Sequence, residues 1–226
     1  MSVWYAIPSA RSAAEAEPQL AKWRSMGYRL ALWRDLDADP IQCDFTLSAA
    51  AYPGYHVATN KLCQEILSMD SAANWIVIGG DDMDPDPTKP PEEIAAECNE
   101  HFGGTFGVMQ PTGDRWSFDG RHVCSEMVAG SPFIGREWCR RMYGGEGPLW
   151  KGYWHFFGDE EMQELAIKYG IFWQRRDLSH HHHHAMRKGG RKAIPQSRNN
   201  GAMFRQMEAI FKQRRAMGFP GHEPLA

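Results

Sequence analysis

Apolar and polar positions in the N-terminal part of the chain predict a strand, a helix and a second strand in succession. Residues 3–7 form a short apolar run that ends at Pro8, and residues 28–33 form another. Residues 13–26 between them are predicted to be helical, and Gly27 follows where a residue with a left-handed backbone often ends a helix. A β-α-β unit within 35 residues favours a parallel sheet with a right-handed crossover.

The rest of the chain continues this alternation of predicted elements. A fully apolar run at residues 75–78 predicts a central strand. Further strands are expected at residues 105–110 and 171–174, helices at 57–69, from Pro91 onward, at 136–142, 158–169 and 199–217, and loops at 35–53 and 85–91.

Length and composition add that the chain suits one α/β domain with a sizeable core. It has 226 residues, 42% of them hydrophobic and 23% charged, which is close to globular averages. The nine Trp residues are costly to expose, so several are expected to line a core or a ligand cleft.

Targeting and cysteine patterns favour a cytoplasmic protein. No apolar run approaches the roughly 18 residues that a membrane span needs, and the N-terminus lacks the basic leader of a signal peptide. The five Cys contain no CxxC pair, so neither a disulfide framework nor a structural zinc site is expected. Nothing in the sequence indicates an obligate protein partner.

Charge is distributed unevenly along the chain. Residues 175–215 contain eleven Lys or Arg and two Asp or Glu, a net charge of +9, whereas the whole chain has −3 and the remainder therefore −12. A basic C-terminal region on an acidic body indicates a polyanionic partner such as DNA. The alternative is a basic face that is merely solvated.

Asp81 and Asp82 directly follow the apolar run at residues 75–78 and two glycines. In open α/β sheets, ligands bind at the carboxyl ends of strands. Adjacent carboxylates repel each other unless a cation lies near them, and Mg²⁺ takes only one or two protein carboxylates while keeping several waters. A divalent cation site is therefore predicted, with a solvent-facing acidic turn as the alternative.

A second acidic group, Asp159, Glu160 and Glu161, opens a predicted helix. Acids are common in a first helical turn because they interact with unpaired N–H groups and the helix dipole. The functional alternative is a general base that removes the proton of an acceptor hydroxyl.

Five consecutive histidines occupy residues 180–184. Neutral imidazole binds divalent metals, but side chains alternate between faces in an extended segment, so at most two or three can reach one ion. A cloning remnant or a solvated loop are the alternatives. Arg187 and Lys188 follow, next to a pair of glycines that suits a loop closing over phosphates.

The order and spacing of these motifs over residues 2–192 resemble inverting, family-2-type glycosyltransferases with the GT-A fold. In that family a polar segment after the first strand holds the nucleotide base. Here the matching segment contains Pro8, Ser9 and Arg11. An acid after the second strand contacts the base or ribose, which matches Asp35, and an Asn near the next helix start matches Asn60.

The family's metal motif, Asp-x-Asp-Asp, is only partly kept. Gly79 stands where the first acid would be, and the resemblance places Asp81 near the ribose and Asp82 on the metal. The family also has Glu-Asp at a helix start with a Gly eleven residues after the Asp. Asp159 and Gly170 keep that interval, whereas Gly158 replaces the Glu.

The resemblance implies a mechanism and a set of residues. Asp159 would be the catalytic base, with Glu160 as the fallback. A metal-binding His is expected roughly ten to thirteen residues after Gly170, which favours His180 and His182 as ligands of Mn²⁺ or Mg²⁺ together with Asp82. The donor would be a nucleotide-diphospho-sugar such as a UDP-sugar, with Arg187 and Lys188 steadying its diphosphate.

Three aromatic residues before Asp159 complete the implied site. Trp150, Trp154 and His155 could form an acceptor platform, because aromatic faces stack on sugars and bases; plain core packing is the alternative.

The predicted organisation is a GT-A domain at residues 1–192, with a Rossmann-like, mostly parallel mixed sheet flanked by helices, and a basic helical extension at 193–226 on or near the acceptor side. Compact phage members of this type glycosylate hydroxymethylated pyrimidines in DNA, which makes such a base the favoured acceptor. A bacterial glycan or protein acceptor, an inactive nucleotide- or nucleic-acid-binding module and a metal-dependent nuclease are the alternatives.

Overall fold

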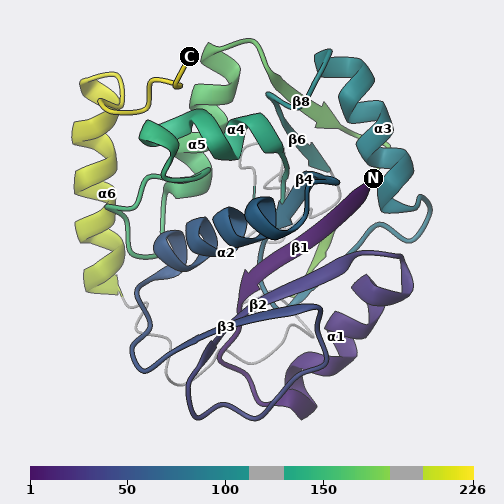
Figure 1. Cartoon of the computed structure of the whole chain (residues 1–226). Coiled ribbons are helices and arrows are strands. Elements are labelled where there is room, and N and C mark those ends of the chain that lie inside the picture. Colours follow the sequence, from purple (N-terminus) through teal and green to yellow (C-terminus); the bar gives the residue numbers. More distant parts are fainter. Residues whose placement is uncertain (112–129, 184–200) are drawn as a thin grey trace, which may run out of the picture.

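The computed structural model describes residues 1–111, 130–183 and 201–226 and has a mixed α/β fold (Figure 1). The strands of the main sheet are β1 (Ser2–Pro8), β2 (Arg29–Asp35), β3 (Phe45–Ala49), β4 (Ala73–Ile78), β6 (Val108–Pro111), β7 (Phe133–Gly135) and β8 (Phe172–Arg175). The described helices are α1 (Ala13–Ser25), α2 (Tyr55–Met69), α3 (Pro91–Phe102), α4 (Arg136–Arg141), the short 3₁₀ helix η2 (Met142–Gly145), α5 (Gly158–Lys168) and α6 (Gly201–Ala216).

The main sheet has seven strands in the order β3-β2-β1-β4-β7-β6-β8. Strands β3, β2, β1 and β4 run parallel to one another, and β6 is parallel to β8, whereas β7 between β4 and β6 is antiparallel to both. The predicted α/β class with a mostly parallel mixed sheet is therefore confirmed.

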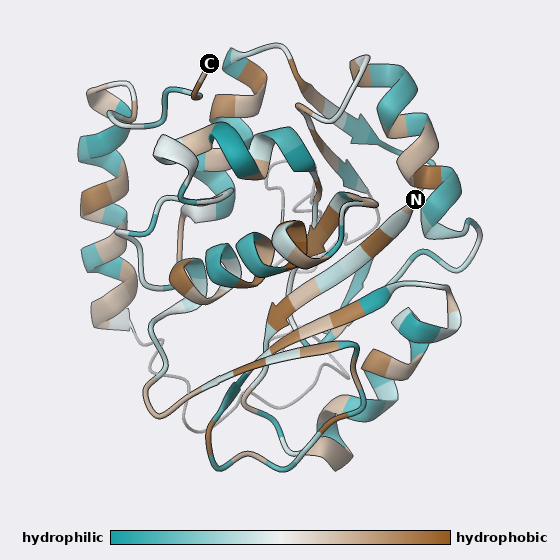
Figure 2. Cartoon of the chain, in the orientation of Figure 1, coloured by the Kyte–Doolittle hydropathy of each residue, from teal (hydrophilic) through white to brown (hydrophobic). Residues whose placement is uncertain are grey.

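Successive residues of the central strands enter two separate cores. In β1, Trp4 and Ala6 pack in one core, whereas Tyr5 and Ile7 pack in the other. This follows from the period of two by which side chains alternate across a strand. Because both faces are covered, these strands are nearly continuous in apolar residues, and Figure 2 shows them as a hydrophobic centre.

Helices cover each face of the sheet. Apolar residues of α2, α4, α5 and α6 belong to one core, and those of α1 and α3 belong to the other. Figure 1 shows this division, with α6 as the outermost helix on the side of α2 and α5. The C-terminal helix thus shares its core with the domain that precedes it.

The first two crossover helices create a switch point in the sheet. Helix α1, which leads from β1 to β2, lies on the opposite face from α2, which leads from β3 to β4. The chain therefore proceeds to one side of β1 and then to the other, with β4 pairing with β1. A crevice outside the carboxyl ends of the strands forms at such a point.

Four strands lie where none was predicted. Strand β3 occupies part of residues 35–53, so the predicted loop there is wrong; its residues alternate between half-buried and exposed, as at the edge of a sheet. Strand β7 is three buried residues long, too short for a periodicity to be read. Strands β5 (Met83–Asp84) and β9 (His181–His182) pair as a separate antiparallel sheet.

No helix in the described ranges is both long and apolar enough to span a membrane.

Candidate active site

The segment after β1 meets the segment after β4 at the switch point. Ser9 donates its hydroxyl hydrogen to Asp81 Oδ2 at 2.6 Å, and Arg11 Nε donates to Asp81 Oδ1 at 2.9 Å. All three side chains are buried. Two predicted donor-binding residues and the first acid of the loop therefore lie together, at the carboxyl edge where the resemblance places the nucleotide.

Arg34 shapes this corner and was missed as a functional residue. Its Nη1 donates to the carbonyl oxygens of Ser9 at 3.0 Å and Arg11 at 2.7 Å, and its Nη2 donates to that of Asp39 at 2.8 Å. Arg34 is only 4% exposed. The sequence offered little signal, because Arg34 follows the apolar run at residues 28–33 and precedes Asp35, where a charged residue at a strand end is usually exposed.

Asp82 pairs with one of the predicted histidines. His182 Nε2 lies 3.3 Å from Asp82 Oδ1. The pair exists because β5 and β9 are antiparallel, with Met83 opposite His182, and because the His183 N–H donates to the Asp82 carbonyl at 2.8 Å. Burial alone would raise the pKa of Asp82, but the hydrogen bond and charge of His182 outweigh it and lower the pKa.

A second acid–imidazole pair lies beside the first. His183 Nε2 is 2.9 Å from Asp84 Oδ2, and Lys22 Nζ donates to both oxygens of the same carboxylate at 2.9 Å. Gln19 also donates to Asp84. Because a lysine already compensates Asp84, this pair suits a structural contact between α1 and the histidine segment.

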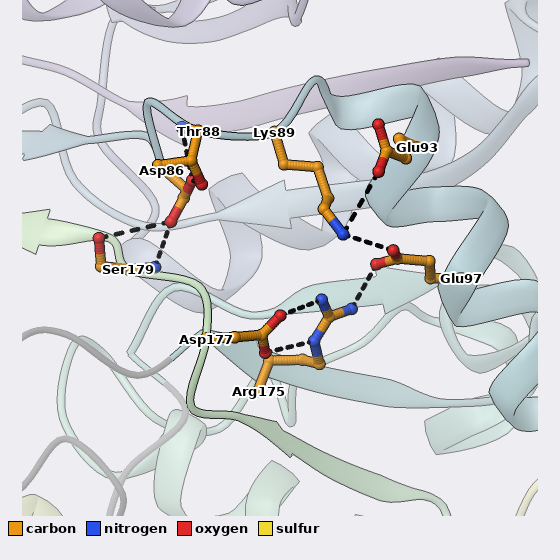
Figure 3. Close-up of polar contacts among 8 residues, drawn as sticks. All are labelled: Asp86, Thr88, Lys89, Glu93, Glu97, Arg175, Asp177 and Ser179. Carbon is orange, nitrogen blue, oxygen red and sulfur yellow. Dashed lines mark hydrogen bonds and ion pairs between the residues drawn. The ribbon is translucent and has the colours of Figure 1, made fainter.

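A polar network holds the segment before the histidines against the loop before α3 (Figure 3). Asp86 accepts hydrogen bonds from the backbone N–H of Ser179 at 2.6 Å and of Thr88 at 2.8 Å. Arg175 donates to Asp177 through two nitrogens and to Glu97 at 2.6 Å. These contacts fix where residues 180–183 meet β5.

His180 takes a different position from the one predicted. It is 1% exposed, with its ring centroid 5.1 Å from that of Trp23 and 5.9 Å from that of Phe133. Nδ1 lies 3.0 Å from Ser131 Oγ, and burial lowers the pKa of the imidazole to about 4. His180 is thus part of the aromatic core, because its position precedes the β9 pairing that orients His182.

The Asp82–His182 pair offers one carboxylate and one imidazole to a cation. Within the described ranges, no group of three or more His, Cys, Asp or Glu is arranged to hold a metal ion. A hard divalent cation that takes the rest of its ligands from water and phosphate oxygens fits two protein ligands. The donor set therefore suits an ion bound jointly with a phosphorylated ligand.

Tyr55 connects this loop to the second acidic group. Its hydroxyl donates to the Gly79 carbonyl oxygen at 3.1 Å. Burial and then the charge of Asp159 raise the pKa of Tyr55. Gly158, which precedes Asp159, packs against the ring of His56, which follows Tyr55, so the start of α5 adjoins the start of α2. Nothing in the sequence marked Tyr55 as this link, since a Tyr that opens a helix is usually a packing residue.

Asp159 and Glu160 have an environment unlike that of Asp82. Burial raises the pKa of the half-buried Asp159. Burial, and then repulsion from Asp159 and Glu164, raise the pKa of Glu160 to about 7. A carboxyl with a raised pKa is a better proton acceptor near neutral pH than an ordinary one. The first turn of α5 therefore offers general-base chemistry.

Steric contacts oppose a larger side chain at both Gly158 and Gly79. A Cβ at Gly158 would lie 1.9 Å from Nε2 of His56, which is 1% exposed and holds the Tyr153 carbonyl at 3.0 Å. A Cβ at Gly79 would lie 3.0 Å from the Tyr5 hydroxyl and from the Met83 sulfur. Side chains that belong to this chain thus fill the space that acids would need.

Glu161, the third acid of the α5 turn, has a structural function. It is fully buried and forms two hydrogen bonds with Arg214 of α6, at 2.7 and 2.9 Å. The hydroxyls of Tyr143 and Tyr153 donate to it at 3.0 and 2.8 Å. This network satisfies the buried carboxylate and attaches α6 to α5.

Two further predicted donor-binding residues lie apart from the corner at Asp81. Asp35 ends β2 and is exposed. Asn60 is buried in α2, where its amide nitrogen donates to the Leu149 carbonyl at 2.7 Å and its oxygen accepts from the Leu149 N–H at 3.1 Å. In this structure Asn60 therefore binds the backbone of Leu149, just before Trp150.

The predicted acceptor residues are partly covered. Arg214 lies 3.7 Å from the ring centroid of Trp150, which is half-buried. Trp154 packs edge-on against Tyr52, with ring centroids 5.9 Å apart. His155 lies edge-on to Tyr55 at 5.8 Å, and burial lowers its pKa to about 4. Trp154 and His155 therefore adjoin Tyr55, whereas Trp150 packs under α6.

Several cations of the basic region, residues 175–215, form ion pairs with acidic residues of the described chain. Arg214 and Arg215 pair with Glu161 and Glu164, Lys212 pairs with Glu208, and Arg175 pairs with Asp177 and Glu97. Arg187 and Lys188 lie outside the described residues.

Comparisons with known proteins give structural likeness alone. No protein-family model matches the chain, and no curated protein matches it. A Drosophila β-1,4-galactosyltransferase 7 mutant in complex with manganese, UDP-Gal and xylobiose aligns at a TM-score of 0.47 with 12% identity, over 87% of this chain and 78% of that one. A glycosyltransferase involved in glycosylation of the major capsid of PBCV-1 aligns at 0.49 with 10% identity, over 80% and 93%. Structural similarity at these TM-scores and identities does not establish an activity. A function therefore has to be argued from the chemistry of the site.

Proposed function

We propose that this chain is a metal-dependent, nucleotide-sugar glycosyltransferase that transfers a sugar to a hydroxyl with inversion. The observation that carries the proposal is the packing around the start of α2: the Tyr55 hydroxyl binds the Gly79 carbonyl, and the neighbouring His56 packs against Gly158, which precedes Asp159. This packing supports a shared site for the loop suited to a cation and the carboxyl suited to act as a base.

In the proposed reaction, the nucleotide binds at the switch point against Ser9 and Arg11. Asp82 and His182 hold the cation, which when bound supplies positive charge against the leaving diphosphate. Asp159 accepts the proton of the acceptor hydroxyl as that oxygen attacks the anomeric carbon from the face opposite the diphosphate. One C–O bond forms, the other breaks, and the diphosphate leaves with the bonding pair.

The first experiment is a melting-temperature screen of nucleotide-diphospho-sugars with Mn²⁺. A ligand that binds the folded state stabilises it by about 2.7 kcal/mol at 100 times its Kd. We expect at least one UDP-sugar to raise the melting temperature in the presence of Mn²⁺ and less so with EDTA. No stabilisation by any nucleotide sugar would contradict the proposal.

A nucleotide-binding module without catalysis is the alternative, and one observation favours it. The space at Gly158 is closed by His56, so the acid that the family has there is excluded. Donor hydrolysis decides between the two: the enzyme releases UDP with Mn²⁺, and Asp159→Asn does not, whereas a module binds the donor and releases nothing in either form.

For the acceptor we propose a hydroxymethylated pyrimidine base in DNA. The net charge of +9 over residues 175–215 supports a polyanion, although the ion pairs of Arg175, Lys212, Arg214 and Arg215 reduce the share available for phosphates. Binding to duplex DNA across a salt series tests this, and absence of binding at low salt would exclude it.

A further inference from the structure

A cavity of about 260 Å³ lies between the segment before α5 and the C-terminal helix. Pro53 and Trp154 line it from the body of the domain, and Met203, Gln206 and Met207 line it from α6. The three α6 residues are spaced three and four apart and therefore share one helical face. The cavity thus has one wall that only α6 supplies.

The cavity shares a wall with the frame of the proposed active site. The Trp154 carbonyl accepts the Tyr55 N–H at 2.7 Å, and Tyr55 in turn reaches the Gly79 carbonyl. A Cβ at Gly54, just before Tyr55, would lie 2.9 Å from the Trp154 carbonyl oxygen. Trp154 therefore packs directly on Gly54 and Tyr55, and the Tyr55 hydroxyl binds the Gly79 carbonyl.

The lining is nearly neutral. Lys151 carries the one charge among the lining residues, and Glu146 lies 2.5 Å from its Nζ. The remaining walls offer an indole, two thioethers and the Gln206 amide. The Trp154 indole N–H is buried and has no hydrogen-bond partner among the described residues. Such walls favour an uncharged ring with hydrogen-bonding groups over a phosphate.

The α6 wall is held firmly. Arg214 forms the buried ion pair with Glu161, and Phe211 stacks on Phe157 with ring centroids 5.2 Å apart. Closer to the cavity, Met207 is 5% exposed, and its sulfur accepts the backbone N–H of Trp154 at 3.3 Å. The cavity is therefore a consequence of the docked helix.

We propose that this cavity is the acceptor subsite and that it takes one uncharged, hydroxyl-bearing ring, with α6 as its outer wall. This rests on the glycosyltransferase function proposed above. The volume is below the roughly 300–1,000 Å³ of pockets for drug-sized ligands, so it accommodates a single ring. A base would have to leave the duplex to enter it.

The test fills the cavity with Met203→Trp and uses Ala209→Trp, an exposed position on the same helix, as the matched control. Two acceptors are compared, 5-hydroxymethyl-2′-deoxycytidine and methyl β-glucoside, with the nucleotide sugar that gives the largest melting shift. We expect Met203→Trp to raise the acceptor KM at least about tenfold while donor hydrolysis stays within about twofold of wild type. Sugar transfer by wild type to the nucleoside would indicate a nucleic-acid acceptor, and transfer to the glucoside would indicate a glycan acceptor.

Binding of each ring to wild type and Met203→Trp by saturation-transfer NMR keeps the two proposals separable. If wild type binds a ring, Met203→Trp does not, and the chain shows no donor turnover, the transferase function is wrong and the cavity is still a ring-binding site. Donor turnover with a wild-type acceptor KM in Met203→Trp, or no binding of either ring, would overturn the subsite.

Discussion

The two acidic groups of the site consist of the same residue types but behave oppositely. Asp82 lies beside His182, whose contact outweighs the cost of burial and lowers the pKa of the carboxyl. At Asp159 and Glu160 burial outweighs the interactions that favour the charged form, among them backbone hydrogen bonds at Asp159 and the charge of Arg215 at Glu160, and it raises the pKa of both, to about 7 for Glu160. The first group is suited to stay ionised against a cation, and the second to accept a proton.

The comparison shows that the partner of a carboxylate, and not its identity, sets its chemistry. Glu161 makes the point within one helical turn, because Arg214 compensates it fully and gives it a structural role. Interactions that favour the charged form lower a carboxyl pKa, and desolvation raises it. The following predictions test this division, beginning with the largest expected effect.

The strongest test of the comparison is Asp159→Asn, which removes the proposed base and keeps the side-chain shape. We expect the rate of sugar transfer to fall by about 10²- to 10⁴-fold, the usual contribution of a general base. The melting temperature should stay the same or rise, since an unfavourably buried carboxyl is removed. Initial rates and thermal melts measure both. Loss of activity in Glu160→Gln with normal activity in Asp159→Asn would transfer the role to Glu160.

Removing the partner of Glu161 should convert a structural acid into a destabilising one. We expect Arg214→Met to lower the free energy of unfolding by about 3–5 kcal/mol, because the buried carboxylate loses its compensating charge. Urea denaturation gives this value. The double variant Arg214→Met with Glu161→Gln should recover part of the loss, and strict additivity of the two single effects would show that the residues are not coupled.

Asp82→Asn sharpens the other half of the comparison. Loss of the anionic ligand should raise the Mn²⁺ concentration needed for half-maximal donor hydrolysis by about tenfold or more. Asp84→Asn is the matched control, since Lys22 and His183 already occupy that carboxylate. Equal effects of the two variants on Mn²⁺ activation would place the cation elsewhere.

The smallest effect concerns stability and pH. Glu160 has a folded-state pKa near 7, above that of an unfolded Glu. Between about pH 4.5 and 7 the folded state therefore holds more protons than the unfolded state, and stability falls as the pH rises. Melting curves from pH 5 to 8 should decline less steeply in Glu160→Gln than in wild type. An unchanged slope would show that Glu160 titrates normally.

Sequence patterns located β4 and the acidic loop after it well. The apolar run at residues 75–78 and the acids after it predicted a strand with a site at its carboxyl end, and β4 with Asp81 and Asp82 lies there. Prediction failed where strands are short or half-exposed, as at β3 and β7. Their periodicity extends over too few residues to be separated from a loop.

The histidine run shows a different limit. Alternation along an extended segment allows His180 and His182 to share a face, yet His180 is buried beside Trp23, and His182 reaches Asp82. The register between β5 and β9 decides this, and it begins only at residue 181. A sequence shows how side chains alternate within one strand. It does not show the register in which that strand pairs with another strand far away in the chain.

The sequence by itself determined the α/β class, the acidic loop after β4 and the acidic start of α5, because hydrophobic period, helix signals and strand ends are local properties. Tertiary structure alone decided that Tyr55 binds the Gly79 carbonyl, that Arg34 holds the backbone at Ser9, and that Arg214 pairs with Glu161. Each of these depends on contacts between residues 20 or more positions apart, whose energies arise only when the two cores have packed.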